Sequence, residues 1–152
     1  CYVAHIGDSR AYLFRDGHLR RLTEDHSLVN SWLKLGMITP EEAVNHPKKN
    51  IILRAIQGKK RPTEAEVSVI TDIQPGDIFL LCSDGVIEGF TDEELEELFS
   101  SRCTLDNYKE VLVEKCLNKS RDNFSFYLLP VESVEKTESL KQNFLSFLYS
   151  FM

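Results

Sequence analysis

The chain has 152 residues, of which 42% are hydrophobic and 28% charged, and its 24 acidic and 18 basic residues give a formal net charge of -6. This is the composition of an ordinary globular domain with a core of its own. The acidic balance argues against a general nucleic-acid binder, which needs a basic face to neutralise phosphates. The four cysteines have no metal-binding spacing, and we interpret them as the reduced thiols of a cytoplasmic protein. No apolar run reaches the ~18 residues of a membrane span.

The chain opens with segments that alternate between apolar and polar residues. Residues 2–7 (YVAHIG) alternate and lead into an aspartate, which predicts a strand followed by a turn. Residues 11–23 (AYLFRDGHLRRLT) predict a β-hairpin, because Asp16 and Gly17 can take the positive φ angles of a tight turn. Because the first residues, from Cys1 onward, resemble the middle of a strand, we expect the chain to start inside a larger domain.

Two helices are predicted next. The first is capped by Asp25 or Ser27 and closed by Gly36. Thr39 and Pro40 are typical of an N-cap and a first helical residue, and they begin a shorter second helix.

The second half of the chain is predicted to alternate extended segments with helices. Strands or extended segments are expected at 50–56, 63–73 and 78–84, helices at 91–101 and 104–120, and a final strand at 124–131. Because hairpins and helices occupy separate stretches, we expect an α+β layered domain rather than a repeating βαβ unit.

Three aspartates stand where a predicted strand begins or ends. Asp8 and Asp84 each follow a strand and Asp122 precedes one, so in an antiparallel sheet they can converge on one rim. Carboxylates and water are the ligands that Mg²⁺ and Mn²⁺ prefer, and two such ions can activate a water and hold a phosphoryl group. The three aspartates are therefore a candidate metal site.

Taken singly, these acids have simpler interpretations. An Asp before Gly or Asn is common in turns, because its side chain bonds local backbone N–H groups. Glu88 alone is typical of a solvated helix entry. Asp25 and His26 are typical of capping and surface positions rather than of catalysis, and for His5 we expect a packing role.

Several stretches together resemble one known family. AHIGDSRAYLFRDGHLRRLTEDHS, LGMITPEEA, LRAIQG, PGDIFLLCSDGV and SRDNFSF occur in the order found in metal-dependent protein serine/threonine phosphatases of type 2C, the PPM family. The resemblance covers residues 2–131 and favours a bacterial member. It implies an antiparallel β-sandwich flanked by helices in an αββα arrangement, with the metal centre at one end. It also implies hydrolysis of phosphoserine and phosphothreonine in proteins by a metal-activated water, with two or three Mn²⁺ or Mg²⁺ ions as cofactors.

The same resemblance implies roles for individual residues. The implied metal ligands are Asp84, Asp122, Asp8 and Glu88, and the supporting residues are Gly85 and Asn123. Asp84 and Asp122 match ligands of the two-metal centre, whereas Asp8 and Glu88 match positions that hold a third ion together with Asp84. The family often has Asp in place of Glu88. Residues 27–50 match the flap beside the active site.

The family's N-terminal half has no counterpart in this sequence. That half would carry an acidic motif, an Asp-Gly-x-Gly-Gly segment with a bridging aspartate, and a phosphate-binding arginine. We therefore expect part of a complete phosphatase, incomplete at its N-terminus and with little activity alone. The alternative is a non-catalytic scaffold that binds a phosphoprotein or a regulatory partner. Coding sequence for Asp-Gly-x-Gly-Gly upstream of Cys1 would favour the enzyme.

We expect three regions: part of a catalytic domain at 1–131, a polar linker at 132–139 and an apolar tail at 140–152. We favour three interpretations of the tail in this order: packing on its own domain, contact with a partner, and interfacial contact with a membrane. The membrane contact is last because basic residues are scarce. The expected partners are phosphoprotein substrates of a serine/threonine kinase in the cytoplasm, with no nucleic acid.

Overall fold

The computed structural model describes residues 1–58 and 62–134. Within this part the elements are β1 (Tyr2–His5), β2 (Arg10–Arg15), β3 (His18–Arg21), α1 (Leu28–Lys34), α2 (Pro40–Val44), β4 (Glu66–Val69), β5 (Ile78–Cys82), α3 (Asp84–Gly89), α4 (Asp92–Ser100), α5 (Leu105–Lys119) and β6 (Phe126–Pro130). The tail at 140–152 and most of the 132–139 linker lie outside the described residues.

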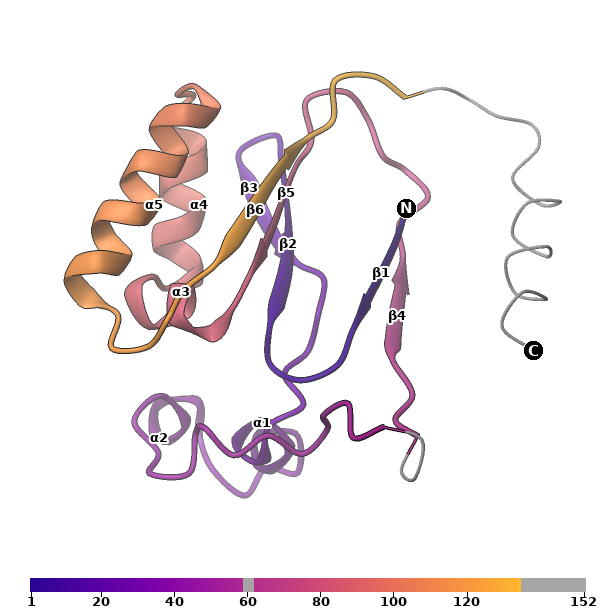
Figure 1. The fold of residues 1–152 in the computed structure, drawn as a ribbon, viewed down its shortest axis with the longest axis vertical. Coiled ribbons are helices and arrows are strands. Elements are labelled where there is room, and N and C mark those ends of the chain that lie inside the picture. Colours follow the sequence, from indigo (N-terminus) through magenta and orange to yellow (C-terminus); the bar gives the residue numbers. More distant parts are fainter. Residues whose placement is uncertain (59–61, 135–152) are drawn as a thin grey trace, which may run out of the picture.

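Two antiparallel sheets make up the β structure. The larger has the strand order β3-β2-β5-β6, and the smaller pairs β1 with β4. In the larger sheet, Arg10 lies opposite Cys82, and Cys82 lies opposite Phe126. Helices α4 and α5 lie on one side of the larger sheet and the β1–β4 pair on the other (Figure 1). The predicted α+β class and the antiparallel sheets flanked by helices are confirmed.

The core follows from the alternation of side chains along β2 and β5. Tyr12 and Leu80 are buried in one cluster with Leu95 of α4 and Leu112 of α5. Their neighbours in sequence point to the opposite face, where Leu13 and Phe79 pack with Ile70 in a second cluster. The central strands β2 and β5 are therefore buried on both faces.

The predicted turn and caps are present. Asp16 and Gly17 connect β2 to β3 with φ angles of 51° and 87°. Ser27, rather than Asp25, caps α1, and its hydroxyl accepts a hydrogen bond from the N–H of Asn30. Thr39 and Thr91 each begin a helix with a complete capping box.

One prediction of local structure is corrected. We expected the next helix after β5 to start at Thr91, but α3 begins at Asp84 itself, directly after the strand. For residues 50–56, where a strand or an extended segment was predicted, the structure has no regular strand, and Ile52 makes an isolated bridge to Ser27. In the part of the chain that the structure describes, no helix is both long and apolar enough to cross a membrane.

Candidate metal centre

The turn from β1 to β2 carries Asp8. Gly7 takes a φ of +102°, a conformation that favours glycine, and Asp8 follows it, half-buried. Burial raises the pKa of the Asp8 carboxyl above its usual range, and the Asp84 carboxylate raises it further. Among the described residues, neither of these acids forms an ion pair with a basic side chain. The charge of Arg10 lowers the pKa of Asp8 by less than burial and Asp84 raise it, so the repulsion between the two carboxylates is only partly offset.

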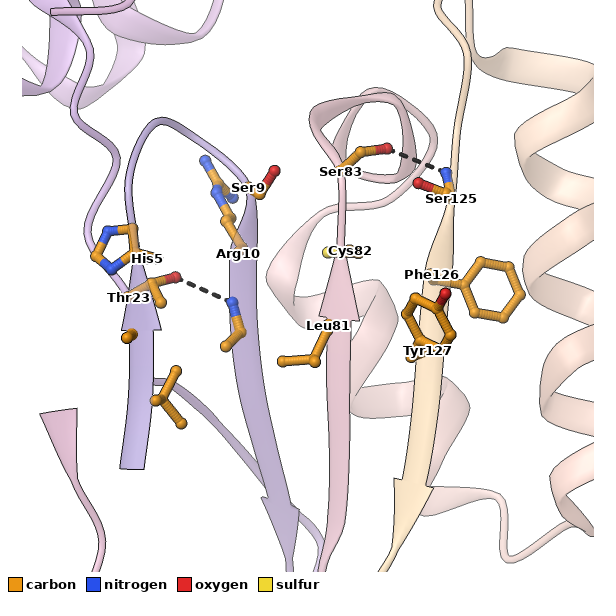
Figure 2. A pocket seen from close by; sticks show the side chains of 13 residues that line it. His5, Ser9, Arg10, Thr23, Leu81, Cys82, Ser83, Ser125, Phe126 and Tyr127 are labelled. Atoms are coloured by element: carbon orange, nitrogen blue, oxygen red, sulfur yellow. Dashed lines mark hydrogen bonds between the residues drawn. The ribbon is translucent and has the colours of Figure 1, made fainter. Parts of the chain in front are cut away.

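Asp84 is held by the end of β5 and the start of α3. One of its oxygens accepts a hydrogen bond from the N–H of Gly85 at 2.9 Å. The preceding residue, Ser83, is hydrogen-bonded to Ser125, which lies between Asp122 and β6. Its N–H donates to the carbonyl of Ser125 at 3.0 Å, and its hydroxyl accepts from the N–H of Ser125 at 3.1 Å (Figure 2).

Gly85 fixes the distance between the two predicted ligand segments. A Cβ at this position would lie 2.4 Å from the carbonyl oxygen of Asn123, so only glycine allows the backbones to approach this closely. The hydroxyl of Ser120 also donates to the carbonyl of Gly85 at 2.7 Å. The α5–β6 loop, which carries Asp122, is therefore packed directly against the start of α3, which carries Asp84.

Asp122 and Glu88 are engaged with neighbouring backbone. Asp122 accepts a hydrogen bond from the N–H of the next residue, Asn123, at 2.7 Å. Glu88 accepts from the N–H of Arg121 at 3.0 Å, and its other oxygen lies 3.9 Å from the ammonium of Lys49. Glu88 is thus occupied by contacts that a bound cation would have to replace.

All four predicted ligands line one open pocket of about 790 Å³. In the described residues, however, no three side chains of the ligand types His, Cys, Asp and Glu are close enough to hold one metal ion. The donors are all oxygens, which suits Mg²⁺ or Mn²⁺, and among the described residues neither Asp8 nor Asp84 has a basic side chain within ion-pair distance. The residues therefore fit a divalent cation in chemistry, whereas their side chains do not form a closed site.

The two arginines of this pocket bind an acid that is not among the predicted ligands. Arg10 forms a fork with Asp25, its Nε and Nη2 donating to the two carboxylate oxygens at 3.0 and 2.8 Å. Arg21 bonds the same carboxylate. Asp92 accepts from the hydroxyl of Tyr12 at 2.7 Å. This network could not be predicted from the sequence, because Arg10 and Asp25, like Tyr12 and Asp92, are far apart in the chain.

His26 is buried, with 8% of its surface exposed, which corrects the prediction of a surface residue. His5 does pack, as expected: its ring stacks on that of His26 with 4.5 Å between centroids.

A smaller pocket of about 270 Å³ lies between β1 and the facing side of β2, β5 and β6 (Figure 2). Its lining includes His5, Arg10 and Cys82 but no carboxylate, so it offers no site for a hard cation. Burial raises the pKa of the Cys82 thiol to about 12. The thiol is therefore protonated at neutral pH and is no nucleophile.

Comparisons with known proteins agree with one another. A family model described as Protein phosphatase 2C matches residues 1–31. The serine/threonine phosphatase stp of Listeria monocytogenes is 40% identical over 135 residues, which are 88% of this chain and 53% of the relative. Protein phosphatase PhpP of Streptococcus pneumoniae is 43% identical over 110 residues, or 72% of this chain and 44% of the relative. The chain thus spans about half the length of the curated relatives it matches.

Solved structures give the same result. A serine/threonine phosphatase of S. agalactiae superposes with a TM-score of 0.78 at 36% identity, covering 86% of this chain and 54% of that one. The catalytic domain of the serine/threonine protein phosphatase PstP, in complex with two manganese ions, superposes with a TM-score of 0.74 at 33% identity, covering 87% of this chain and 54% of that one.

Proposed function

Because this chain belongs to the protein phosphatase 2C family, we propose that it supplies the C-terminal part of a metal-dependent protein serine/threonine phosphatase. The observation that carries the proposal is the approach of the Asp8 and Asp84 carboxylates without a basic partner, on the same pocket as Glu88 and Asp122. Structural carboxylates in a folded protein are normally paired or hydrogen-bonded to donors that offset their charge. Backbone hydrogen bonds and the charge of Arg10 offset this pair only in part, and a divalent cation would supply the remaining charge.

We assign the residues as follows. Asp84 and Asp122 hold a two-metal centre, and Asp8 and Glu88 contribute with Asp84 to a third cation. The chemistry that Mn²⁺ or Mg²⁺ supplies when bound is activation of a water and neutralisation of charge on a phosphoryl group. The protein's own contribution is to orient the carboxylates: the contact of Gly85 with Asn123 sets the spacing of the two-metal ligands.

Glu88 has to exchange partners before it can serve as a ligand. Its carboxylate now binds the N–H of Arg121 and faces Lys49. The extra methylene of Glu relative to Asp gives the side chain the length to turn away from these groups toward Asp84. This exchange makes the third cation the weakest of the proposed sites.

The substrates we propose are proteins phosphorylated on serine or threonine by a kinase of the cytoplasm. An open pocket of about 790 Å³ admits an exposed phosphorylated segment. The relatives named above are serine/threonine and protein phosphatases. The bridging aspartate and the phosphate-binding arginine are expected in the part of those relatives that this chain does not span.

A non-catalytic scaffold is the second candidate, and one observation favours it. The described residues include no cluster of three side chains able to hold one ion. Such a scaffold would bind a phosphoprotein without hydrolysing it.

Phosphatase assays on para-nitrophenyl phosphate and on a phosphothreonine peptide separate the two. We would compare the 152-residue chain with a chimera that places the unspanned part of the Listeria phosphatase before Cys1, each with Mn²⁺ and with EDTA. Activity in the chimera that EDTA and Asp84→Ala abolish supports the enzyme. A folded chimera that is inactive with Mn²⁺ but binds the phosphopeptide supports the scaffold.

A further inference from the structure

His26 lies at a junction of four segments of the chain. Its ring Nδ1 accepts a hydrogen bond from the N–H of Gly7 at 3.1 Å, and its own backbone N–H donates to the carbonyl of Gly7 at 2.9 Å. Its Nε2 lies 3.1 Å from a carboxylate oxygen of Glu66, and its carbonyl accepts from the N–H of Leu53 at 2.7 Å. The ring stacks on His5.

The hydrogen bonds assign the tautomer of the ring. Because Nδ1 accepts from an N–H, it carries no proton, so in the neutral ring the proton is on Nε2. Nε2 then donates to Glu66, and this hydrogen bond is the main reason that the pKa of the Glu66 carboxyl is lowered. The guanidinium of Arg54 lies farther from the same nitrogen, at 3.4 Å. The two ring nitrogens thus have different tasks: Nδ1 holds the β1–β2 turn and Nε2 holds β4.

Gly7 is the residue in that turn whose conformation needs support. Its φ of +102° lies in a region open to glycine, and holding glycine in one conformation costs more entropy than holding any other residue. Both of its backbone polar groups bind to His26, so the orientation of both peptide planes at Gly7 depends on one residue. The next residue is Asp8, and its backbone direction follows from that of Gly7.

We propose that His26 is a positioning residue for Asp8. By holding Gly7 through the ring Nδ1 and the backbone N–H, His26 fixes the direction in which the Asp8 carboxylate faces Asp84. The role rests on the proposed function, since it matters only if that carboxylate pair binds a cation. His26 itself touches neither the cation nor the substrate.

Two substitutions of His26 separate positioning from general structural support. The Oδ1 of His26→Asn takes the place of Nδ1, so this variant keeps an acceptor for Gly7 and loses the bond to Glu66. The amide of His26→Gln reaches the place of Nε2, so this variant keeps the bond to Glu66 and loses the acceptor for Gly7. Glu66→Gln, which keeps His26 intact, is the matched control.

The readouts are the Mn²⁺ affinity of the 152-residue chain, by isothermal titration, and hydrogen exchange of the Gly7 amide, by NMR. We expect His26→Gln to bind Mn²⁺ about tenfold more weakly, as when the hydrogen-bond partner of a ligand is removed, and to lose protection at Gly7. His26→Asn and Glu66→Gln should keep Gly7 protected and bind Mn²⁺ within about twofold of wild type.

Three results would overturn the proposal: equal loss of affinity in His26→Asn and His26→Gln, loss in neither, or unchanged Gly7 protection in His26→Gln. Circular dichroism of each variant excludes unfolding as the cause. Failure of the metal site is recognised separately, because the wild type would then bind Mn²⁺ no better than Asp84→Asn. In that event the Gly7 amide alone decides whether His26 holds the turn.

Discussion

The two ends of β5 each carry an aspartate, and their surroundings are opposite. Asp77, just before the strand, is 1% exposed. The Nε and Nη2 of Arg15 donate to its two oxygens at 2.7 Å each, and the N–H of Gln74 donates at 3.0 Å. The hydrogen bond from Arg15 is the largest cause that lowers the pKa of this carboxyl. Asp84, just after the strand, has no such partner and instead raises the pKa of Asp8.

Strand β2 carries the matching pair of arginines. Arg15, at its end, binds Asp77, whereas Arg10, at its start, binds Asp25 and leaves Asp84 unpaired. An aspartate whose charge is offset by a partner stabilises the folded state. An aspartate beside a like charge destabilises it, and a bound cation can relieve this repulsion. Under the proposed function, the Asp77 end of the sheet is structural and the Asp84 end is the binding end.

The largest effect is expected from a change that breaks the binding end alone. Gly85→Ala places a Cβ against the carbonyl of Asn123, which is backbone and cannot turn away. We expect a loss of about 3 kcal/mol in the free energy of unfolding, measured in urea. Gly89→Ala is the control: its Cβ would lie 3.5 Å from the sulfur of Cys116, an ordinary contact, and the helix gains from alanine. Equal losses in both variants would contradict this account of Gly85.

Breaking the structural end should cost somewhat less. Asp77→Asn removes the charge that Arg15 binds and should lower the free energy of unfolding by about 2 kcal/mol. Asp72→Asn tests the exposed partner of the same arginine and should leave the free energy of unfolding nearly unchanged, because solvent screens this pair. Similar costs for the two substitutions would mean that burial does not set the strength of this ion pair.

The pH dependence of stability distinguishes the same two ends. Because the folded-state pKa of Asp77 lies below its ordinary value of 3.8, its contribution is complete above that value and is lost as the pH falls through the folded-state pKa. Asp77→Asn should therefore flatten the acid limb of a urea-midpoint profile below about pH 4. If the urea midpoint of the variant fell with pH as steeply as that of the wild type, carboxyls other than Asp77 would cause the loss of stability in acid.

The smallest effect has the opposite sign. The pKa of Asp8 is raised, first by burial and then by Asp84, so the charged form is disfavoured in the folded state and the penalty is relieved as the pH falls. Asp8→Asn should raise the free energy of unfolding at pH 7 in EDTA by about 0.5 kcal/mol. A destabilised variant would mean that Asp8 already has a favourable partner.

Local signals in the sequence were sufficient for most of the fold. The capping residues Thr39 and Thr91 and the turn at Asp16 act through neighbours within four positions, so their roles could be predicted. Helix α3 was missed because Ser-Asp-Gly is typical of a turn, and this helix depends on tertiary contacts such as that of Gly85. His26 was predicted to be a surface residue because its burial also depends on contacts with distant segments of the chain.

The candidate site was predicted as residue types but not as contacts. Nothing near Glu88 in the sequence indicates that Arg121 engages its carboxylate, and nothing near His26 indicates Gly7 or Glu66 as partners. Such pairs depend on how distant segments meet. The sequence therefore identified the acids, whereas the structure was needed to show which of them lack a counter-charge.

Unfolding with and without Mn²⁺ tests most directly whether the binding end of β5 holds a cation. Asp84→Asn and Asp72→Asn each remove one negative charge. Asp84 lines the pocket, whereas Asp72 forms an ion pair with Arg15 at the other end of the sheet. At a hundredfold excess of Mn²⁺ over its dissociation constant, the wild type and Asp72→Asn should gain about 2.7 kcal/mol, and Asp84→Asn should gain nothing. The same gain in all three proteins, or no gain in the wild type, would contradict the assignment of Asp84 to a metal centre.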